Sequence, residues 1–507
     1  MRRSALSQYM LRKLNISRLS VRNMSGAADN ARPSYDKVIA DIANYVHDYE
    51  VTSPVAWKTA RLCLLDSLGC AFGALKYPQA QQLVKPIVSG MTVPNGVRVP
   101  GTDHVHEPLR GAYSIGTLVR FLDFNDTGLM KEWFHPSDAL GAILSIADWQ
   151  TRLAKSTGGK EGHVFKIKDI LECMIKAHEI QGCIALENSF NRVGIDHVIL
   201  VKVASTAVIS KMLGLSREQT MAAISHAFVD GQAMRTYRHA PNTMSRKSWA
   251  AGDACMRAVH LALLVKGGEG GMPSVLTAKT WGFYDVLFKG QPFKFQRDYG
   301  SYIMENVLFK ISFPAEFHAQ TAVEAAVTVH KKLQELGKTT DDIKHIRIRT
   351  QEAAIRIIDK KGPLYNYADR DHCIQYMVAV PLIKGSLVAD DYHDKVASDP
   401  RIDELRSKME CVEDARFSTE YHAPDKRSIG NALQVTLKDG TVLDEVEVEY
   451  PIGHRRRREE GIPLLLQKFD RHLRELLPDA EVSAIQKASE DNMEGMDVDS
   501  YVDLYTK

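Results

Sequence analysis

The sequence predicts a mainly α-helical protein that carries an α+β segment in its second half. Apolar residues recur at helical spacing over most of residues 35–287, whereas the alternation typical of strands appears only after them. Helical periodicity returns beyond Pro451. Because a chain of 507 residues is too long for one compact core, we expect about two to four domains.

The helical part contains clear start and stop signals. Ser53 followed by Pro54 is a typical helix start, and residues 216–219 have the Ser-x-x-Gln pattern of a capping box. Residues 250–265 predict a further helix, which is followed by the glycine-rich residues 267–271. These glycines lack the Lys-Ser/Thr pair of a phosphate-binding loop, so we interpret them as a helix stop.

The later segment mixes strands and helices. Residues 343–350 alternate with period two, and residues 433–448 do so around an Asp-Gly turn, which predicts a hairpin. Residues 320–336 and 373–387 have helical patterns, and so do residues 462–477 near the end. The sequence therefore predicts an α+β domain of about 150 residues before the final helices.

The first 24 residues differ from the rest of the chain. They carry six cations, four serines and no acid, and Leu6, Met10 and Leu14 fall on one helical stripe. This combination is typical of a mitochondrial transit peptide, which we place at residues 1–30, and it predicts a protein of the matrix. The alternative is a basic arm without regular structure.

Charge and hydropathy exclude some partners. Subtracting the six N-terminal cations from the formal net charge of +2 leaves the remaining chain at −4. Such a chain is poorly suited to neutralise phosphates, and no apolar run reaches the roughly 20 residues that span a bilayer. We therefore expect neither nucleic acid nor membrane as a partner.

The seven cysteines are scattered, with no C-x-x-C pair. This spacing argues against a zinc ribbon, a disulfide framework and an iron–sulfur cluster. We expect acid–base chemistry, with no metal and no other cofactor.

Polar clusters interrupt the apolar helical sequence. In the first, Asp123 and Thr127 would share one face of a helix, and His135 follows soon after. An acid, a hydroxyl and an imidazole suit proton transfer, although helix capping around a loop is an alternative. In the second, His197 precedes an apolar helix at residues 198–208, where a capping or core histidine is the alternative.

Basic clusters form a second kind of candidate site. Four cations and a histidine lie within 13 residues, which predicts an anion site or, alternatively, a solvated basic loop: Arg235, Arg238, His239, Arg246 and Lys247. Residues 455–458 are four arginines that resemble a nucleic-acid patch. The two glutamates that follow them favour a solvated helix start instead.

Long stretches of the chain resemble the 2-methylcitrate dehydratase family. They are FLDFNDT…HPSD, NSFNRVGIDHV, HAFVDGQAMRTYRHAPNTMSRKSWAAGDA, ISFPAEFHAQTAVEAA, ADRDHCIQYMVAVPLIKG and YPIGHRRRREEGIP. The similarity extends from about residue 35 to the end. It implies a homodimer in which residues 35–297 and 450–507 form a large all-helical domain and residues 298–449 form an α+β lid domain.

The resemblance also implies the site, in the cleft between domain and lid. Its catalytic residues are His135, His197, Asp123 and Lys247, with the histidines as acid and base and Asp123 orienting one of them. The resemblance also points to Thr127 as a substrate-binding residue and to Lys310 and His318 of the lid, which would complete the site on closure and exclude water. From the basic cluster, Arg235 and Arg238 would bind substrate carboxylates together with Lys247. The related cis-aconitate decarboxylase has a different local sequence where this chain has residues 128–134.

The implied reaction removes water from 2-methylcitrate and gives 2-methyl-cis-aconitate, within the methylcitrate cycle of propionate catabolism. It needs no metal, and weaker activity on the tricarboxylate citrate is expected. One alternative is a lyase like cis-aconitate decarboxylase. Another is a non-catalytic protein that binds RNA or a protein partner through residues 455–458.

Overall fold

The computed structural model describes residues 30–506, and residues 35–507 form one compact unit. The predicted transit peptide, residues 1–30, lies outside the described residues except for its last position. Among the described helices, none combines the length and the apolar character needed to cross a membrane.

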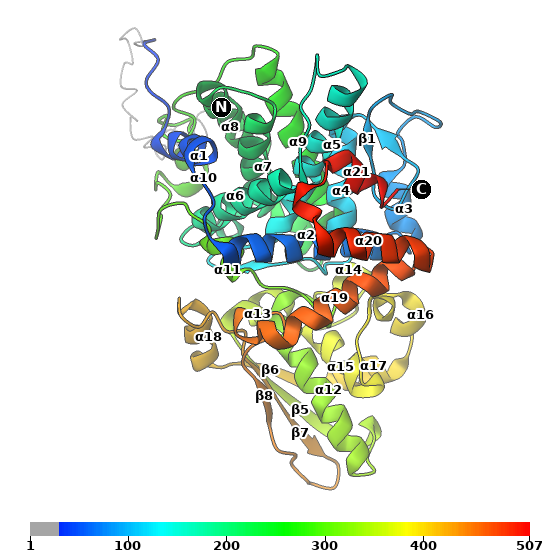
Figure 1. The fold of residues 1–507 in the computed structure, drawn as a ribbon. Coiled ribbons are helices and arrows are strands. Elements are labelled where there is room, and N and C mark those ends of the chain that lie inside the picture. The colour runs from blue at the N-terminus through cyan, green and yellow to red at the C-terminus, as the bar shows by residue number, and fades with distance from the viewer. Residues whose placement is uncertain (1–29, 507) are drawn as a thin grey trace, which may run out of the picture. The chain divides into compact units, whose positions relative to one another are not determined.

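The first part of the unit is helical (Figure 1). Its helices α4 and α7 are central, because α4 packs against α2, α5 and α9, and α7 packs against α6, α8 and α9. The helices are α1 (Lys37–Asp48), α2 (Pro54–Ala74), α3 (Pro78–Val84), α4 (Pro108–Arg120), α5 (Leu140–Ser156), α6 (Ile167–Ala185), α7 (Val198–Met212), α8 (Arg217–Val229), α9 (Arg246–Lys266), α10 (Phe283–Phe288) and α11 (Tyr302–Asn306).

The predicted helix starts and stops are confirmed. Ser53 Oγ accepts a hydrogen bond from the backbone N–H of Ala56, and Ser216 forms the predicted capping box with Gln219. Helix α9 ends at Lys266, immediately before the glycine-rich residues.

Helices α4 and α9 approach each other closely. A Cβ atom at Gly252 would lie 2.4 Å from both the Oγ1 atom of Thr117 and the carbonyl oxygen of Tyr113. Only glycine therefore permits this spacing. The close packing positions the site, because it brings the end of α4 beside the first turn of α9.

Two short antiparallel hairpins interrupt the helices. They are β1 (Val97–Arg98) with β2 (Val105–His106), and β3 (Gly128–Leu129) with β4 (Trp133–Phe134). The second hairpin carries side chains away from the helical core, since Leu129 and Trp133 are buried in the hydrophobic core of the later α+β segment.

The α+β segment is built on a four-stranded mixed sheet of order β6-β5-β7-β8. Strand β5 (Ile343–Thr350) has the predicted bounds, and β7 (Asn431–Leu437) pairs antiparallel with β8 (Val446–Val448) around the predicted turn. Strand β6 (Met409–Glu413), which pairs parallel with β5, was not predicted. The mainly helical fold class with an α+β insert is confirmed.

Helices accompany this sheet, and α12 contacts both β7 and α15. They are α12 (Gln320–Glu335), α13 (Glu352–Ile358), α14 (Tyr367–Arg370), α15 (Ile374–Lys384), α16 (Asp394–Ala397), α17 (Pro400–Ser407) and α18 (Ala415–His422).

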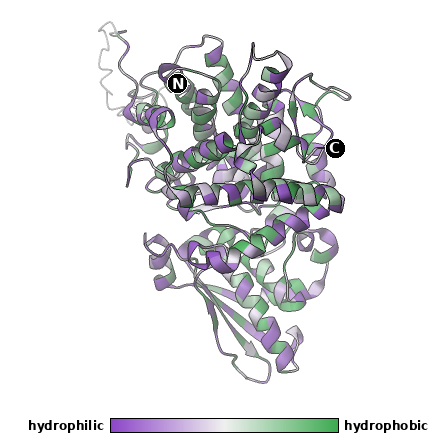
Figure 2. Ribbon diagram, in the orientation of Figure 1, coloured by the Kyte–Doolittle hydropathy of each residue, from purple (hydrophilic) through white to green (hydrophobic). Residues whose placement is uncertain are grey.

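The chain then returns to the helical part through α19 (Arg458–Arg474), α20 (Asp479–Asp491) and α21 (Val498–Asp503). Helix α19 packs on α2, and α21 packs on α5. In Figure 2, hydrophobic and hydrophilic residues alternate along α19 and α20, as expected for helices with one buried face.

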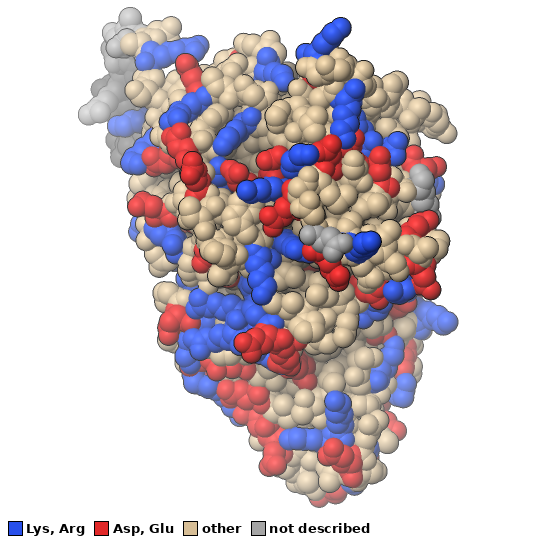
Figure 3. Space-filling view, in the orientation of Figure 1, with Lys and Arg blue, Asp and Glu red and all other residues tan. Residues whose placement is uncertain are grey.

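The side chains of the four arginines at residues 455–458 contact both the α+β segment and the helical part. Lys and Arg side chains gather over α18 and the start of α19 (Figure 3). Arg455 and Arg456 donate to the carbonyl oxygen of Asp425, and Arg457 pairs with Glu324 at 2.9 Å. Arg458, the first residue of α19, is partly buried and donates to the carbonyl oxygen of Val307 at 2.9 Å, so its side chain turns toward the protein and not into solvent.

Candidate active site

The end of α4 places a carboxylate among three cations. Asp123 adopts a left-handed conformation, with φ of 50°, and the residues from 121 to 127 are not helical. The predicted shared helical face of Asp123 and Thr127 is therefore wrong. The Asp123 carboxylate accepts from Arg120 Nη1 at 2.5 Å, from Lys247 Nζ at 3.4 Å and from Lys310 Nζ.

These cations decide the charge of Asp123. Burial would raise the pKa of this carboxyl group, but Arg120, Lys310 and Lys247 lower the pKa well below its usual value. Asp123 hydrogen-bonds to neither His135 nor His197. Arg120 bonds to both Asp123 and His135 and so links them, and His372 Nε2 lies 4.0 Å from the Asp123 carboxylate.

The hairpin β3–β4 folds His135 back onto Thr127. The imidazole Nδ1 lies 2.8 Å from the carbonyl oxygen of Asp126 and 3.1 Å from Thr127 Oγ1. The other nitrogen, Nε2, lies 2.9 Å from Arg120 Nη2. Because a guanidinium group only donates and a carbonyl only accepts, His135 is neutral, with its proton on Nδ1.

His197 lies at the N-terminus of α7 and faces His135. The two rings meet edge to face with their centroids 5.5 Å apart. Neither ring nitrogen of His197 makes a hydrogen bond of good geometry among the described residues, although the side chain is buried; Nδ1 lies 3.4 Å from Asp196 Oδ1. Burial lowers the pKa of both histidines well below the usual value, and Arg120 lowers it further.

Arg235 and Arg238 lie on the Asp196 side of His197 but differ in their contacts. Arg238 Nη2 donates to Asp196 at 3.2 Å, and its Nε donates to the same carboxylate, so its charge is neutralised. Arg235 Nη1 is 3.7 Å from Glu132 and 3.9 Å from Asp196, and makes no hydrogen bond among the described residues. Of the two predicted carboxylate ligands, Arg235 is the one with an unused donor.

Two residues from the α+β segment join the cluster at Lys247. Lys247 Nζ donates to Asp371 at 2.7 Å, and His372 Nδ1 donates to the same carboxylate at 2.7 Å. Burial would raise the pKa of Asp371, but Lys247 and His372 lower it. Sequence reasoning missed Asp371 and His372, although both lie within the stretch ADRDHC that carries part of the family resemblance, and it missed Arg120 as well.

His318 is placed apart from the other predicted residues. Its Nδ1 is 2.8 Å from Glu316, and its Nε2 accepts from the indole N–H of Trp133 at 2.7 Å. The structure thus joins six predicted residues by short contacts: Asp123, Thr127, His135, His197, Lys247 and Lys310. His318 hydrogen-bonds to none of these six, but its partner Glu316 donates its backbone N–H to the carbonyl oxygen of Asp371 at 3.2 Å.

Unsatisfied polar atoms gather at this site. Among the described residues, buried side-chain atoms without a hydrogen-bond partner include Arg120 Nε, Glu132 Oε1, Arg235 Nη1 and both nitrogens of His197. Buried polar groups are normally paired, so such a group of unpaired donors and acceptors is typical of a place where a polar ligand binds.

Two sets of buried side chains offer donors at the spacing of a metal site. They are Cys63, Asp126 and His178, and Asp123, Asp371 and His372. A divalent cation in the second set would meet the three cations that already neutralise Asp123. In the first set, His178 Nε2 and the Asp126 carboxylate hydrogen-bond to each other at 2.9 Å, and His178 Nδ1 lies 2.8 Å from the carbonyl oxygen of Met174.

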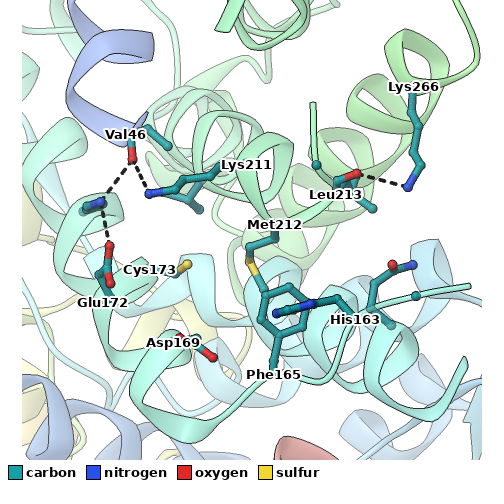
Figure 4. Close-up of a pocket in the computed structure, with 15 residues that line it drawn as sticks. Val46, His163, Phe165, Asp169, Glu172, Cys173, Lys211, Met212, Leu213 and Lys266 are labelled. Carbon is teal, nitrogen blue, oxygen red and sulfur yellow. Dashed lines mark hydrogen bonds and ion pairs between the residues drawn. The ribbon is translucent and has the colours of Figure 1, made fainter. Parts of the chain in front are cut away.

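A separate pocket of about 540 Å³ lies between α6, α7 and the end of α1 (Figure 4). Its lysines are occupied by helix-end carbonyls, since Lys211 donates to Val46 at 3.2 Å and Lys266 to Leu213 at 3.1 Å. None of the histidines or arginines of the cluster around Asp123 lines it. We therefore assign the chemistry to the Asp123 cluster.

Two buried imidazoles that face each other, with several cations nearby, are typical of an enzyme that uses acid–base catalysis on an anionic substrate. The chain belongs to the MmgE/PrpD family. The MmgE/PrpD N-terminal domain matches residues 40–296, and the MmgE/PrpD C-terminal domain matches residues 313–492.

Named relatives match nearly the whole chain. The chain is 71% identical to the mitochondrial 2-methylcitrate dehydratase of Yarrowia lipolytica, over 96% of this chain and 94% of the relative. It is 64% identical to a probable 2-methylcitrate dehydratase of Saccharomyces cerevisiae, over 94% of each. It is 60% identical to the 2-methylcitrate dehydratase of Escherichia coli, over 95% of this chain and the full length of that enzyme.

Proposed function

We propose that the chain is a hydro-lyase that removes water from 2-methylcitrate and gives 2-methyl-cis-aconitate. The names of the relatives support the substrate. The observation that carries the proposal is the buried pair His135 and His197, 5.5 Å apart, beside cations with unused donors.

The mechanism needs a base, an acid and positive charge. A base removes a weakly acidic proton next to a carboxylate, and an acid protonates the leaving hydroxyl group. His135 and His197 are the pair suited to these two transfers. Lys247, Lys310 and Arg235 stabilise the charge that develops on the carboxylate.

Arg120 couples substrate binding to this chemistry. Without substrate, its guanidinium group donates to Nε2 of His135. The other ring nitrogen, Nδ1, is hydrogen-bonded to the carbonyl oxygen of Asp126. A substrate carboxylate that draws Arg120 away exposes this lone pair. The added negative charge also raises the pKa of both histidines, so that one of them holds the proton needed by the leaving group.

The direct test is incubation of the purified protein with 2-methylcitrate and a chelator, while the absorbance of the conjugated product is followed. We expect full activity with the chelator, and roughly 10–200-fold weaker turnover of citrate, which lacks one methyl group. Loss of activity with the chelator would contradict a metal-independent mechanism. Release of CO₂ from cis-aconitate, without water loss from 2-methylcitrate, would establish the decarboxylase alternative.

The pH dependence of kcat/KM tests the histidines. Because burial lowers the pKa of His135 and of His197 well below the usual value, both are neutral around pH 7 in the free enzyme. The general acid must therefore take up a proton as the substrate binds, and we expect kcat/KM to fall as pH rises above neutral. Removing the Arg120 charge in Arg120→Gln raises the pKa of His135, so the limb of the pH profile that His135 governs moves to higher pH. An unchanged pH profile in this variant would contradict the assignment of His135.

The proposal includes the location of the enzyme, its oligomeric state and its domains. We place it in the mitochondrial matrix as a homodimer, in agreement with the mitochondrial name of the Yarrowia relative and with the charge pattern of residues 1–24. We further propose a helical domain of residues 35–297 and 450–507 and a lid of residues 298–449. The packing of α19 on α2 and the separate hydrophobic core of the α+β segment support this division. The exception is residues 303–311, because α11 packs on α6 and α2 and these residues contribute to the core of the helical part.

A further inference from the structure

A cleft of about 510 Å³ opens beside the hairpin β3–β4. One wall comes from the helical part, with Lys131 and Trp133 of the hairpin region and Arg192 of the turn Asn191–Val193. The other wall comes from the lid segment, with Arg356 of α13, His422 of α18 and Arg427. Side chains from both parts of the fold therefore face one cavity.

The cleft has an excess of positive charge. Lys131 pairs with Glu187 at 2.5 Å, and Arg356 pairs with Glu352 at 3.0 Å. Within the described part of the chain, Arg192 and Arg427 have no ion-pair partner. Burial lowers the pKa of His422, and Arg427, Lys131 and Arg192 lower it further. These three cations therefore lie near His422, and all of them line the cleft.

Trp133 separates this cleft from the site. Its indole N–H donates to His318, and the guanidinium groups of Arg356 and Arg235 lie 4.9 and 5.4 Å from the centre of its ring. Arg356 lines the cleft, whereas Arg235 is a buried member of the site. The Trp133 side chain thus lies between Arg356 of the cationic cleft and Arg235, the predicted carboxylate ligand that has an unused donor.

A substrate must cross a barrier to reach the site, because His135, His197, Lys247 and Arg235 are all less than one tenth exposed. We propose that the cleft is a capture site for a tricarboxylate anion, which Arg192 and Arg427 hold until Trp133 turns aside and Arg235 receives it. This proposal rests on the proposed function, because it assumes an anionic substrate for the buried site.

The test is the double variant Arg192→Glu/Arg427→Glu. Stopped-flow tryptophan fluorescence measures the association rate of citrate at low ionic strength, and steady-state kinetics gives kcat and kcat/KM for 2-methylcitrate. We expect association to slow about 10-fold or more, since electrostatic steering changes on-rates by this order. We expect kcat to stay within about 2-fold, since neither arginine contacts the histidines, and the difference in association to shrink as salt is added.

The matched control is Lys160→Glu/Arg347→Glu, which makes the same change of net charge at two exposed cations outside the cleft. If the cleft variant and the control slow association equally, or neither does, the capture site is wrong. If the wild-type protein binds citrate through these arginines but does not dehydrate 2-methylcitrate, the proposed function fails and the capture site stands.

Discussion

Replacing His197 with leucine is expected to lower kcat for 2-methylcitrate by about 10²–10⁴-fold, the usual contribution of a positioned acid or base. The same change is expected to leave the melting temperature unchanged or higher. The loss of activity is expected because His197 faces His135, with ring centroids 5.5 Å apart. The unchanged stability is expected because the buried imidazole makes no hydrogen bond of good geometry among the described residues and has only a 3.4 Å contact with Asp196.

The physical reason lies in the balance of hydrogen bonds. A buried polar group without a partner costs stability, and an apolar side chain of similar size removes that cost. Asp196 keeps its partners when the imidazole is lost, because Arg238 and the backbone N–H of Val198 still donate to it. Residues kept at the expense of stability are typically those that function requires.

His106→Leu is the contrasting control. His106 is also buried, but its Nε2 lies 2.9 Å from the carbonyl oxygen of Val84, and it is not part of the site. We expect this variant to lose stability and keep activity. A His197→Leu protein with near-normal turnover would contradict the role of His197, as would one that is unfolded when His106→Leu is not.

Replacing Lys247 with alanine is expected to lower kcat/KM by at least 10²-fold and to destabilise the fold by about 1.5–3 kcal/mol, the usual value of a hydrogen bond to a buried charged group. Among the described lysines and arginines, Lys247 is the one that contacts both Asp123 and Asp371. Its loss removes positive charge from the substrate site and leaves Asp371 with His372 as its remaining side-chain partner.

The sign of the pH dependence identifies the cause of the lost stability. In the wild-type protein the folded pKa of Asp371 is lowered, so this group contributes stability above its unfolded pKa of about 3.9 and loses it as pH falls. Without Lys247 that pKa rises. The difference in melting temperature between variant and wild type should therefore be large near pH 7 and shrink toward pH 4.

Lys202→Ala provides a matched control, because Lys202 is also buried and pairs with Asp230 at 3.0 Å. It should lose stability without losing activity. If Lys247→Ala and Lys202→Ala lower kcat/KM equally once both are folded, the loss reflects general destabilisation, and Lys247 has no special role.

Local signals in the sequence predicted much of the fold. A capping serine, an Asp-Gly turn and the apolar period are each decided by neighbouring residues, which is why α2, α8 and β5 begin where expected. Strand β6 was missed because its pairing with β5 joins residues about 60 positions apart, and its short sequence has no clear alternation.

In the candidate site, too, residues marked by local sequence were predicted, whereas contacts between distant residues were not. Asp123, His135 and His197 stood out because they interrupt apolar sequence, but the contacts that set their charges are not local. Arg120 is an ordinary residue at a helix end until the hairpin folds His135 against it. Asp371 meets Lys247 only because the chain crosses into the lid segment and returns.

The hairpin β3–β4 has a consequence for engineering. It is attached covalently to the helical part, yet Leu129 and Trp133 are buried in the hydrophobic core of the α+β segment. A lid expressed alone would therefore lack two of its own core side chains. Exchanging the α+β segment between relatives would need to transplant residues 128–134 as well, and any motion of that segment would pull on β4, which immediately precedes His135.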